Sequence, residues 1–258
     1  LLNLVLVLGA CRANGISLTS VNFSKFNPNL GLSKELFLKS LPISLASGVS
    51  QINLVVGRQI SSLFDGAIVW LIYADRLAQL PIALIGVALN VVSLPKLSTL
   101  KDSGRLEEGN SYLNQSMQVS VIFSIPATLG LIYLNSEIIE FLFQRGNFLV
   151  HDTIQTSLAL SIYSLSIIPI SLQMLLLNFY FSEKKIKIPF YYSIVSVFLN
   201  VGFAYSLLGK FEFLAPPIAY AITNWLVFVS LLCHTYKFGF YFNNTFKRSL
   251  PKIFLSGF

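Results

Sequence analysis

The sequence contains few charged residues. Asp, Glu, Lys and Arg together make up 11% of its 258 residues, whereas a soluble domain carries about 25%. Cysteine and histidine are also scarce, with two of each, and neither is spaced as in a zinc site or a disulfide framework. The motifs H-E-x-x-H, G-x-S-x-G and G-x-x-x-x-G-K-[ST] are absent. These deficits exclude a disordered chain and argue against a soluble enzyme, so no catalytic residue, metal site or cofactor is predicted.

Long apolar runs take the place of the missing charge. Hydrophobic residues account for 54% of the chain, including 22 Phe, and a membrane-spanning helix needs roughly 20 mostly apolar residues. The runs are continuous and too long for barrel strands of about 10 residues. Six segments qualify as full spans: Phe37–Leu63, Ala67–Leu94, Met117–Leu134, Thr153–Phe181, Ile188–Leu208 and Ala215–Tyr236. The predicted fold is an all-α polytopic membrane bundle.

Shorter apolar stretches at the two ends predict partial helices. Leu1–Cys11 has no basic n-region, so it does not read as a signal peptide, and Leu250–Phe258 is its counterpart at the other end. We expect the middle of a longer protein, with three parts. These are the end of a span with a cytoplasmic connector (1–36), a six-helix lobe (37–236), and a cytoplasmic loop with the start of a further span (237–258).

The connections between spans predict the orientation of the bundle. Phe64–Gly66 is a tight polar turn, whereas the other connections are longer or more basic. One side receives 14 of the 18 basic residues, and the opposite side receives only Arg145 and Lys210. Because Lys and Arg favour cytoplasmic loops, the basic side is predicted to be cytoplasmic, and the net charge of +7 needs no nucleic acid to explain it. The basic side consists of Arg12–Leu36, Lys96–Gln115, Ser182–Lys187 and Lys237–Ser249 with the adjoining helix ends.

Asp75 and Arg76 lie within the second predicted span. An ionisable group at the bilayer centre costs at least about 2.5–3.5 kcal/mol, so such groups are functional candidates. Neighbouring helical residues point about 100° apart, which directs Arg76 toward another helix or an anionic ligand. Asp75 can share a helix face with Gln79, four residues on. A buried ion pair that only fixes helix packing is the alternative.

Arg58 ends a polar stripe on the first predicted span. The stripe runs through Ser40, Ser44, Ser47, Gln51 and Arg58 at helical spacing. Such a stripe must face protein or water, so it either lines an aqueous cavity shared with Arg76 or packs against another helix. A similar stripe at Ser157, Ser161, Ser164 and Ser171 favours packing.

Prolines inside the spans predict kinks. Pro126 and Pro169 are two such positions. Pro81 follows Arg76 by five residues, and Gly86 follows soon after. A bend at this point would loosen the helix that holds the charged pair, which suits either a moving part or a static kink.

Several sequence blocks, in order, closely resemble the MurJ (MviN) family of bacterial lipid II flippases. They are SQINL at 50–54, WLIYADRL at 70–77, QLP at 79–81, GVAL at 86–89, LPKLS at 94–98, FQRGNF at 143–148, DT at 152–153, NFYF at 178–181 and KIP at 187–189. The block around Asp75 and Arg76 is the most specific. The resemblance implies the MATE-like fold of fourteen helices, of which this chain would be essentially the C-terminal lobe.

The resemblance also implies a function. Such a protein moves lipid II, an undecaprenyl-pyrophosphate-linked precursor, across the bacterial inner membrane by alternating access, together with an N-terminal lobe absent from this sequence. Arg76 corresponds to a cavity arginine of the family, and Asp75 to its neighbour. Gln79 stands where the family often has an acidic residue, and Arg58 matches no family arginine. The candidate substrate-binding residues are therefore Arg76, Asp75, Arg58, Gln79 and Gln51, with membrane lipids around them and no assigned coupling ion.

Two other functions compete with this interpretation. A MATE-like multidrug or oligosaccharide-lipid exporter shares the fold, but it would favour lone carboxylates for proton coupling. A non-transporting scaffold for cell-wall enzymes would need its cytoplasmic loops rather than Arg76.

Overall fold

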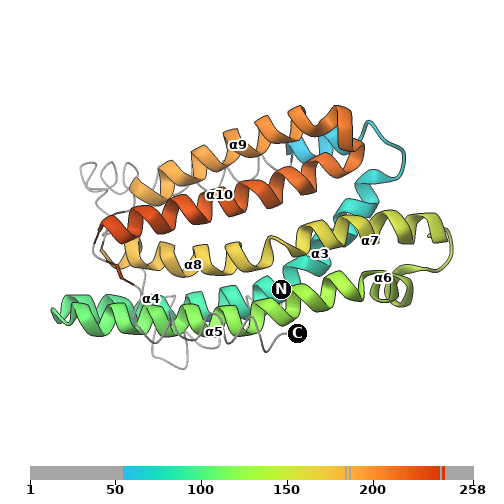
Figure 1. The fold of residues 1–258 in the computed structure, drawn as a ribbon. Helices are drawn as coiled ribbons and strands as arrows, with labels where there is room; N and C mark the ends of the chain where they lie inside the picture. Colours follow the sequence, from blue (N-terminus) through green and yellow to red (C-terminus); the bar gives the residue numbers. More distant parts are fainter. Residues whose placement is uncertain (1–54, 184, 186, 239, 242–258) are drawn as a thin grey trace, which may run out of the picture. The chain divides into compact units, whose positions relative to one another are not determined.

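Helices account for almost all of the chain that the structure, a computed structural model, describes (Figure 1). The described residues are 55–183, 185, 187–238 and 240–241. Among them there is no strand, so the predicted all-α class is confirmed. After helical residues 55–61, the elements are α3 (Ala67–Pro81), the π-helix η3 (Ile82–Val87), α4 (Ala88–Asp102), α5 (Leu106–Tyr133), α6 (Asn135–Phe143), α7 (Val150–Ser164), α8 (Ile167–Ser182), α9 (Lys187–Phe211), the 3-10 turn η4 (Glu212–Leu214) and α10 (Ala215–Lys237).

Four helical stretches in this part of the chain, some of them made of more than one helix, are long and apolar enough to cross a membrane. They are Ala67–Asp102, Leu106–Tyr133, Val150–Ser182 and Lys187–Lys237. The last stretch reverses direction at η4, so α9 and α10 lie side by side as an antiparallel pair (Figure 1). The predicted membrane bundle is confirmed. The count of six stays a prediction, because Leu1–Cys11, the Arg12–Leu36 connector, most of Phe37–Leu63 and Leu250–Phe258 lie outside the described residues.

The connections gather at the two ends of the bundle as the charge pattern predicts. The α4–α5 turn, the end of α8 and the end of α10 lie at one end, and residues 62–66, α6 and η4 lie at the other (Figure 1). Most of the described basic residues belong to the first end, and Arg145 and Lys210 to the second. We therefore refer to these as the predicted cytoplasmic end and the outer end.

The prediction that Lys96–Gln115 is a connector between helices is wrong. α4 continues to Asp102 and α5 begins at Leu106, so the link is a short turn in which Gly104 has a φ of +73°, a conformation that favours glycine. The 36-residue stretch from Ala67 to Asp102 is about 54 Å long, against roughly 30 Å of hydrocarbon. The polar end of this stretch therefore projects beyond the hydrocarbon while it remains helical. Hydropathy alone does not distinguish such a projecting helix end from a connecting loop.

Another predicted span also differs from the structure. Thr153–Phe181 is two helices, since α7 ends at Ser164 and α8 begins at Ile167 with Pro169 in its first turn. Pro126, by contrast, lies within an unbroken α5. The sequence analysis also missed α6, a helix of nine residues that is too short to cross a bilayer.

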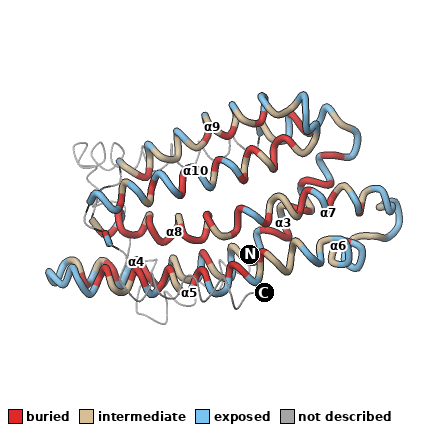
Figure 2. The backbone as a smooth tube through the Cα atoms, viewed as in Figure 1, coloured by how far each residue is buried: buried red, intermediate tan, exposed pale blue. Residues whose placement is uncertain are grey.

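α8 lies at the centre of the packing, and most of its residues are buried (Figure 2). Leu175, Leu176 and Tyr180 of α8 join α4, α5 and α10 in the largest apolar cluster. α5 presents a stripe of small polar residues to this core, which lets the helices approach closely. The stripe comprises Ser116, Ser120, Ser124 and Thr128, all buried.

The serine stripe of α7 and α8 serves packing, as favoured from the sequence. Ser157, Ser164 and Ser171 are buried, and the first two donate to backbone carbonyls one turn earlier. Ser161 receives a hydrogen bond from Asn135 (2.8 Å) at the start of α6. These hydroxyls therefore stabilise contacts between helices and do not line the cavity described below.

A π-helix occupies the position of the predicted bend. α3 ends at Pro81, and η3 follows directly. Gly86 of η3 is buried against α8: a Cβ atom there would lie 3.2 Å from Ser171 Oγ and Met174 Sδ, and 3.3 Å from Ser171 Cα. One turn on, Asn178 of α8 donates to the Asn90 carbonyl (2.9 Å). π-Helical turns are rare and often lie at functional sites.

Ionic contacts join α4 to the α8–α9 turn at the predicted cytoplasmic end. Glu183 accepts hydrogen bonds from Lys101 and from Lys185, the latter at 2.6 Å. Lys101 Nζ also lies 3.9 Å from the Phe179 ring centroid. Burial raises the pKa of the Glu183 carboxyl, but the two ammonium groups more than offset this and hold the pKa below its ordinary value.

We predict that Gly86→Ala destabilises the protein. The added methyl group would displace the α8 backbone, and overpacking of this kind costs about 1–3 kcal/mol. Thermal unfolding of the full protein in detergent measures the effect. Gly202→Ala is the matched control, because its new Cβ would meet nothing within 4 Å. Equal melting temperatures for the two variants would contradict the close packing of η3 on α8.

Glu183→Gln should reveal a pH-dependent contribution to stability. Because the pKa of Glu183 is lowered by folding, its charged form stabilises the fold above the ordinary glutamate pKa of about 4.3, and the contribution is lost as the pH falls through the folded value. The melting temperature of the wild type should exceed that of Glu183→Gln at pH 7, and the gap should close in acid. A gap of constant size from pH 7 to below pH 4 would count against the ionic contacts.

Candidate functional site

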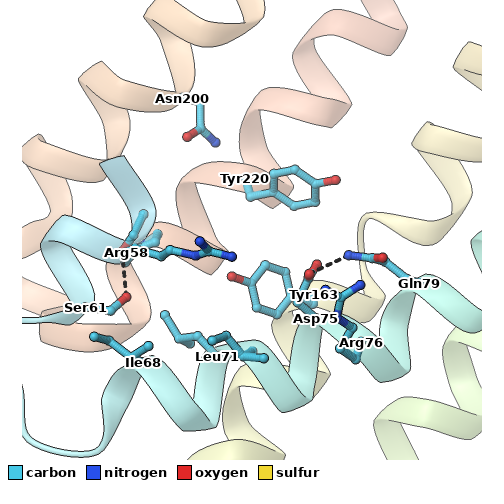
Figure 3. Close-up of a pocket in the computed structure, with 13 residues that line it drawn as sticks. Arg58, Ser61, Ile68, Leu71, Asp75, Arg76, Gln79, Tyr163, Asn200 and Tyr220 are labelled. Carbon is cyan, nitrogen blue, oxygen red and sulfur yellow. Dashed lines mark hydrogen bonds between the residues drawn. The ribbon is translucent and has the colours of Figure 1, made fainter. Parts of the chain in front are cut away.

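A cavity of about 430 Å³ opens in the outer half of the bundle. Its walls come from helical residues 55–61, α3, α7, α9 and α10 (Figure 3). Ile68 and Pro216, the second residues of α3 and α10, mark its outer limit. Its lining residues are Gly57, Arg58, Ser61, Ile68, Leu71, Ile72, Asp75, Arg76, Gln79, Tyr163, Asn200, Pro216 and Tyr220. Four of the five predicted site residues are among them, and the fifth, Gln51, lies outside the described residues.

α3 gives one face to the cavity and the other to α7. Its six lining residues, from Ile68 to Gln79, recur at intervals of three and four, which places them on one side of a helix. On the other side, Ala74 and Ala78 are buried with Ala159 and Leu160 of α7. These small side chains let α7 approach closely, so the polar face of α3 points into the cavity.

A second contact fixes the outer end of α3. Asp152, at the start of α7, accepts a hydrogen bond from Trp70 Nε1 (2.7 Å) and another from the Leu149 backbone N–H (2.7 Å). The Trp70 ring also meets the His151 and Phe213 rings edge to face. Asp152 and its neighbour Thr153 were noted only as a sequence landmark, and the structure shows what the carboxylate does.

The cavity has more positive than negative charge. Arg58 and Arg76 are both exposed, and Asp75 is the one carboxylate among the lining residues. Asp75 accepts a hydrogen bond from Gln79, as their spacing predicts (Figure 3). Within the part of the chain that the structure describes, neither guanidinium forms an ion pair. A buried ion pair that only fixes packing is thus not what the structure shows for Arg76.

The two arginines belong to different packing groups. Arg76 is on α3, which packs against α7, whereas Arg58 is on helical residues 55–61, whose Ile60 packs against Ala204 of α9 and Ala219 of α10. Figure 3 shows Arg58 entering from one side, and Arg76 with Asp75 and Gln79 on the other. A shift between the two groups would therefore change the spacing of the guanidinium groups.

Four polar residues of the cavity were not predicted from the sequence: Ser61, Tyr163, Asn200 and Tyr220. Tyr163 comes from α7, Asn200 from α9 and Tyr220 from α10, and the two tyrosine rings meet edge to face with centroids 5.8 Å apart. Polar uncharged residues are common in membrane helices, so a search for charge passes over them. Only the packing of separate helices brings these side chains together.

Other places in the described residues offer less to a ligand. No group of three or more His, Cys, Asp or Glu side chains there could hold a metal ion. A second cavity of about 320 Å³ lies beside the start of α5, lined by Glu107, Glu108, Asn110, Ser111, Asn114 and Tyr241. It lacks a cation and lies outside the apolar core, so the outer cavity is the stronger candidate for binding an anion.

Comparisons with known proteins agree on one family. A family model described as "Lipid II flippase MurJ" matches residues 1–257. A solved structure of "Lipid II flippase MurJ, inward closed conformation" superposes with a TM-score of 0.72 at 27% identity, covering 84% of this chain and 46% of that one.

Curated relatives give the same result. A "Probable lipid II flippase MurJ" of Rhizobium tropici is 33% identical over 238 residues, which is 92% of this chain and 44% of the relative. The Aquifex aeolicus protein of the same description is 31% identical over 89% of this chain and 46% of its own length. The chain thus spans less than half of the length of these relatives.

Cysteine labelling should show that the α3 face meets water. Ile72→Cys, in an otherwise cysteine-free full protein, should react with a membrane-impermeant charged thiol reagent, because Ile72 lines the cavity. Ala74→Cys should stay unlabelled, since Ala74 is fully buried. Leu84→Cys is the second control, because Leu84 is highly exposed but lies outside the cavity, and we expect it to react little. Equal labelling at positions 72 and 84 would contradict a water-filled cavity.

Proposed function

The chain belongs to the MurJ family of lipid II flippases, and we propose that it is one lobe of a carrier for lipid-linked peptidoglycan precursor in the bacterial inner membrane. The carrier moves lipid II from the inner to the outer leaflet without making or breaking a bond in it. Residues 37–236 form this lobe. The other half of the path corresponds to the part of the relatives that this chain does not match.

Two unpaired guanidinium groups in one membrane cavity are the observation that carries this proposal. A charge at membrane depth is costly unless it has a partner or water, and Arg58 and Arg76 have no carboxylate partner among the described residues. Arginine presents a planar fork of N–H donors that matches phosphate oxygens. The pyrophosphate of lipid II provides the missing counter-charge.

Asp75 and Gln79 support Arg76 in this proposal. The Gln79 side-chain amide donates a hydrogen bond to one carboxylate oxygen of Asp75. This bond holds the carboxylate next to Arg76, about one turn before Gln79 on α3. The neighbouring carboxylate offsets part of the cost of placing a guanidinium group at this depth, about 14 Å from the start of α3. Because Asp75 forms no ion pair with the guanidinium group, Arg76 stays available to a ligand.

Movement of the substrate requires the cavity to open on each side in turn. The cavity lies between the α3–α7 pair and the α9–α10 pair, and η3 follows directly after the segment that bears Arg76. We propose that the two packing groups shift relative to each other, with η3 as the place where the long helix bends. The spacing of Arg58 and Arg76 would then differ between states and would help to release the pyrophosphate.

Replacement of Arg76 tests the function. Arg76→Ala should reduce lipid II translocation by the full protein at least tenfold, because a charge-assisted bidentate contact is lost. Arg76→Lys should recover only part of the rate, since an ammonium group keeps the charge but not the fork. Accessibility of lipid II to an external probe in cells or proteoliposomes measures the rate.

Controls separate this function from its competitors. Arg105→Ala, at an exposed position of the α4–α5 turn, should leave translocation unchanged. Intact lipid II exposure in Arg76→Ala with lost efflux of a drug would support a multidrug exporter. Intact translocation in Arg76→Ala together with defective cell-wall synthesis in Arg105→Ala would support a scaffold instead.

A further inference from the structure

Tyr163 offers an unused hydroxyl group to the cavity. It lies on α7, its ring packs with the apolar cluster of α3 and α7, and it meets the Tyr220 ring edge to face at 5.8 Å and 70°. The ring is thus held firmly from two sides. In Figure 3 the hydroxyl points into the cavity, toward the side from which Arg58 enters. Among the described residues, no hydrogen bond to this hydroxyl is formed.

Two other tyrosines in the membrane helices, Tyr180 and Tyr192, have hydrogen-bond partners within the protein. The Tyr180 hydroxyl bonds to His234 Nδ1 (2.7 Å) and Thr235 Oγ1 (2.9 Å), and Tyr192 donates to the Ser230 carbonyl (3.1 Å). The Tyr163 hydroxyl borders the cavity instead, where water or a ligand can accept its hydrogen bond. Tyr163 therefore has the features of a group whose partner is a ligand.

The neighbouring charges define that ligand. A phenol can donate or accept a hydrogen bond, and a ligand held by Arg58 and Arg76 offers anionic oxygens. A hydrogen bond to an ionised acceptor is about twice as strong as one between neutral groups. An anionic oxygen next to the two guanidinium groups is thus the best acceptor for the Tyr163 O–H.

We propose that Tyr163 is a third substrate-binding residue, whose hydroxyl donates a hydrogen bond to a pyrophosphate oxygen of the ligand that Arg58 and Arg76 hold. The inference rests on the proposed function and extends it, because the three groups come from three separate elements and surround the anion. It also assigns Tyr220 the different role of supporting the ring of Tyr163.

Two tyrosine-to-phenylalanine variants of the full protein test the inference. In lipid nanodiscs, Tyr163→Phe should weaken lipid II binding by about 10- to 100-fold, the range for a hydrogen bond to a charged group. Tyr205→Phe is the matched control, since it removes the same atom from an exposed tyrosine of α9 outside the cavity, and its affinity should stay within about twofold of the wild type. Undecaprenol, which has no phosphate, should bind equally well to all three proteins.

Inorganic pyrophosphate identifies the acceptor. It should compete with lipid II in the wild type, and Tyr163→Phe should weaken this competition as strongly as it weakens lipid II binding. A loss confined to lipid II would place the contact on the sugar or the peptide and would overturn the proposal. Tyr163→His restores a donor near the same place and should recover part of the affinity, which decides the question if Tyr163→Phe folds poorly.

The outcomes for the two proposals can be told apart. If the wild type binds neither lipid II nor pyrophosphate, the proposed function fails and Tyr163 loses its role with it. If the wild type binds both and Arg76→Ala does not, but Tyr163→Phe binds as tightly as the wild type, the inference about Tyr163 is wrong and the function stands.

Discussion

The charge of two guanidinium groups that form no ion pair among the described residues, in a cavity within an apolar bundle, is the constraint on which the rest of the site depends. Lipid cannot solvate it, so the surrounding helices must supply water, a dipole or a ligand. The structure places both cavity arginines at a hollow and leaves them free of ion pairs within the described residues. Asp75, held by Gln79, moderates the positive charge without cancelling it. This arrangement suits a carrier, which must bind an anion and release it again.

The packing of the bundle explains how the cavity stays open. Small residues allow close packing of α3 against α7, and of helical residues 55–61 against the α9–α10 pair. Each arginine is therefore held by a separate packed group of helices. Between these groups the polar faces do not close on each other, and the cavity remains. Gly86 and the π-helix join this region to the central helix α8. The cavity face that bears Arg76 and the bend are thus neighbours along one helix.

Much of this could be predicted from the sequence, and the exceptions have physical causes. Hydropathy located α9 and α10 to within a few residues, because charged or turn residues bound them. It failed at residues 96–115, where polar helix ends project beyond the membrane. Arg76 was found because charge is rare in membrane spans. Tyr163 was not, because tyrosine is common there, and an unpaired hydroxyl becomes apparent only when neighbouring helices are in place.

The central claim is that Arg58 and Arg76 together hold the anionic headgroup. A cryo-electron microscopy structure of the full protein with lipid II bound tests it most directly. Phosphate density between the two guanidinium groups is the predicted result. Headgroup density elsewhere, with either arginine directed into the acyl chains, would contradict the account.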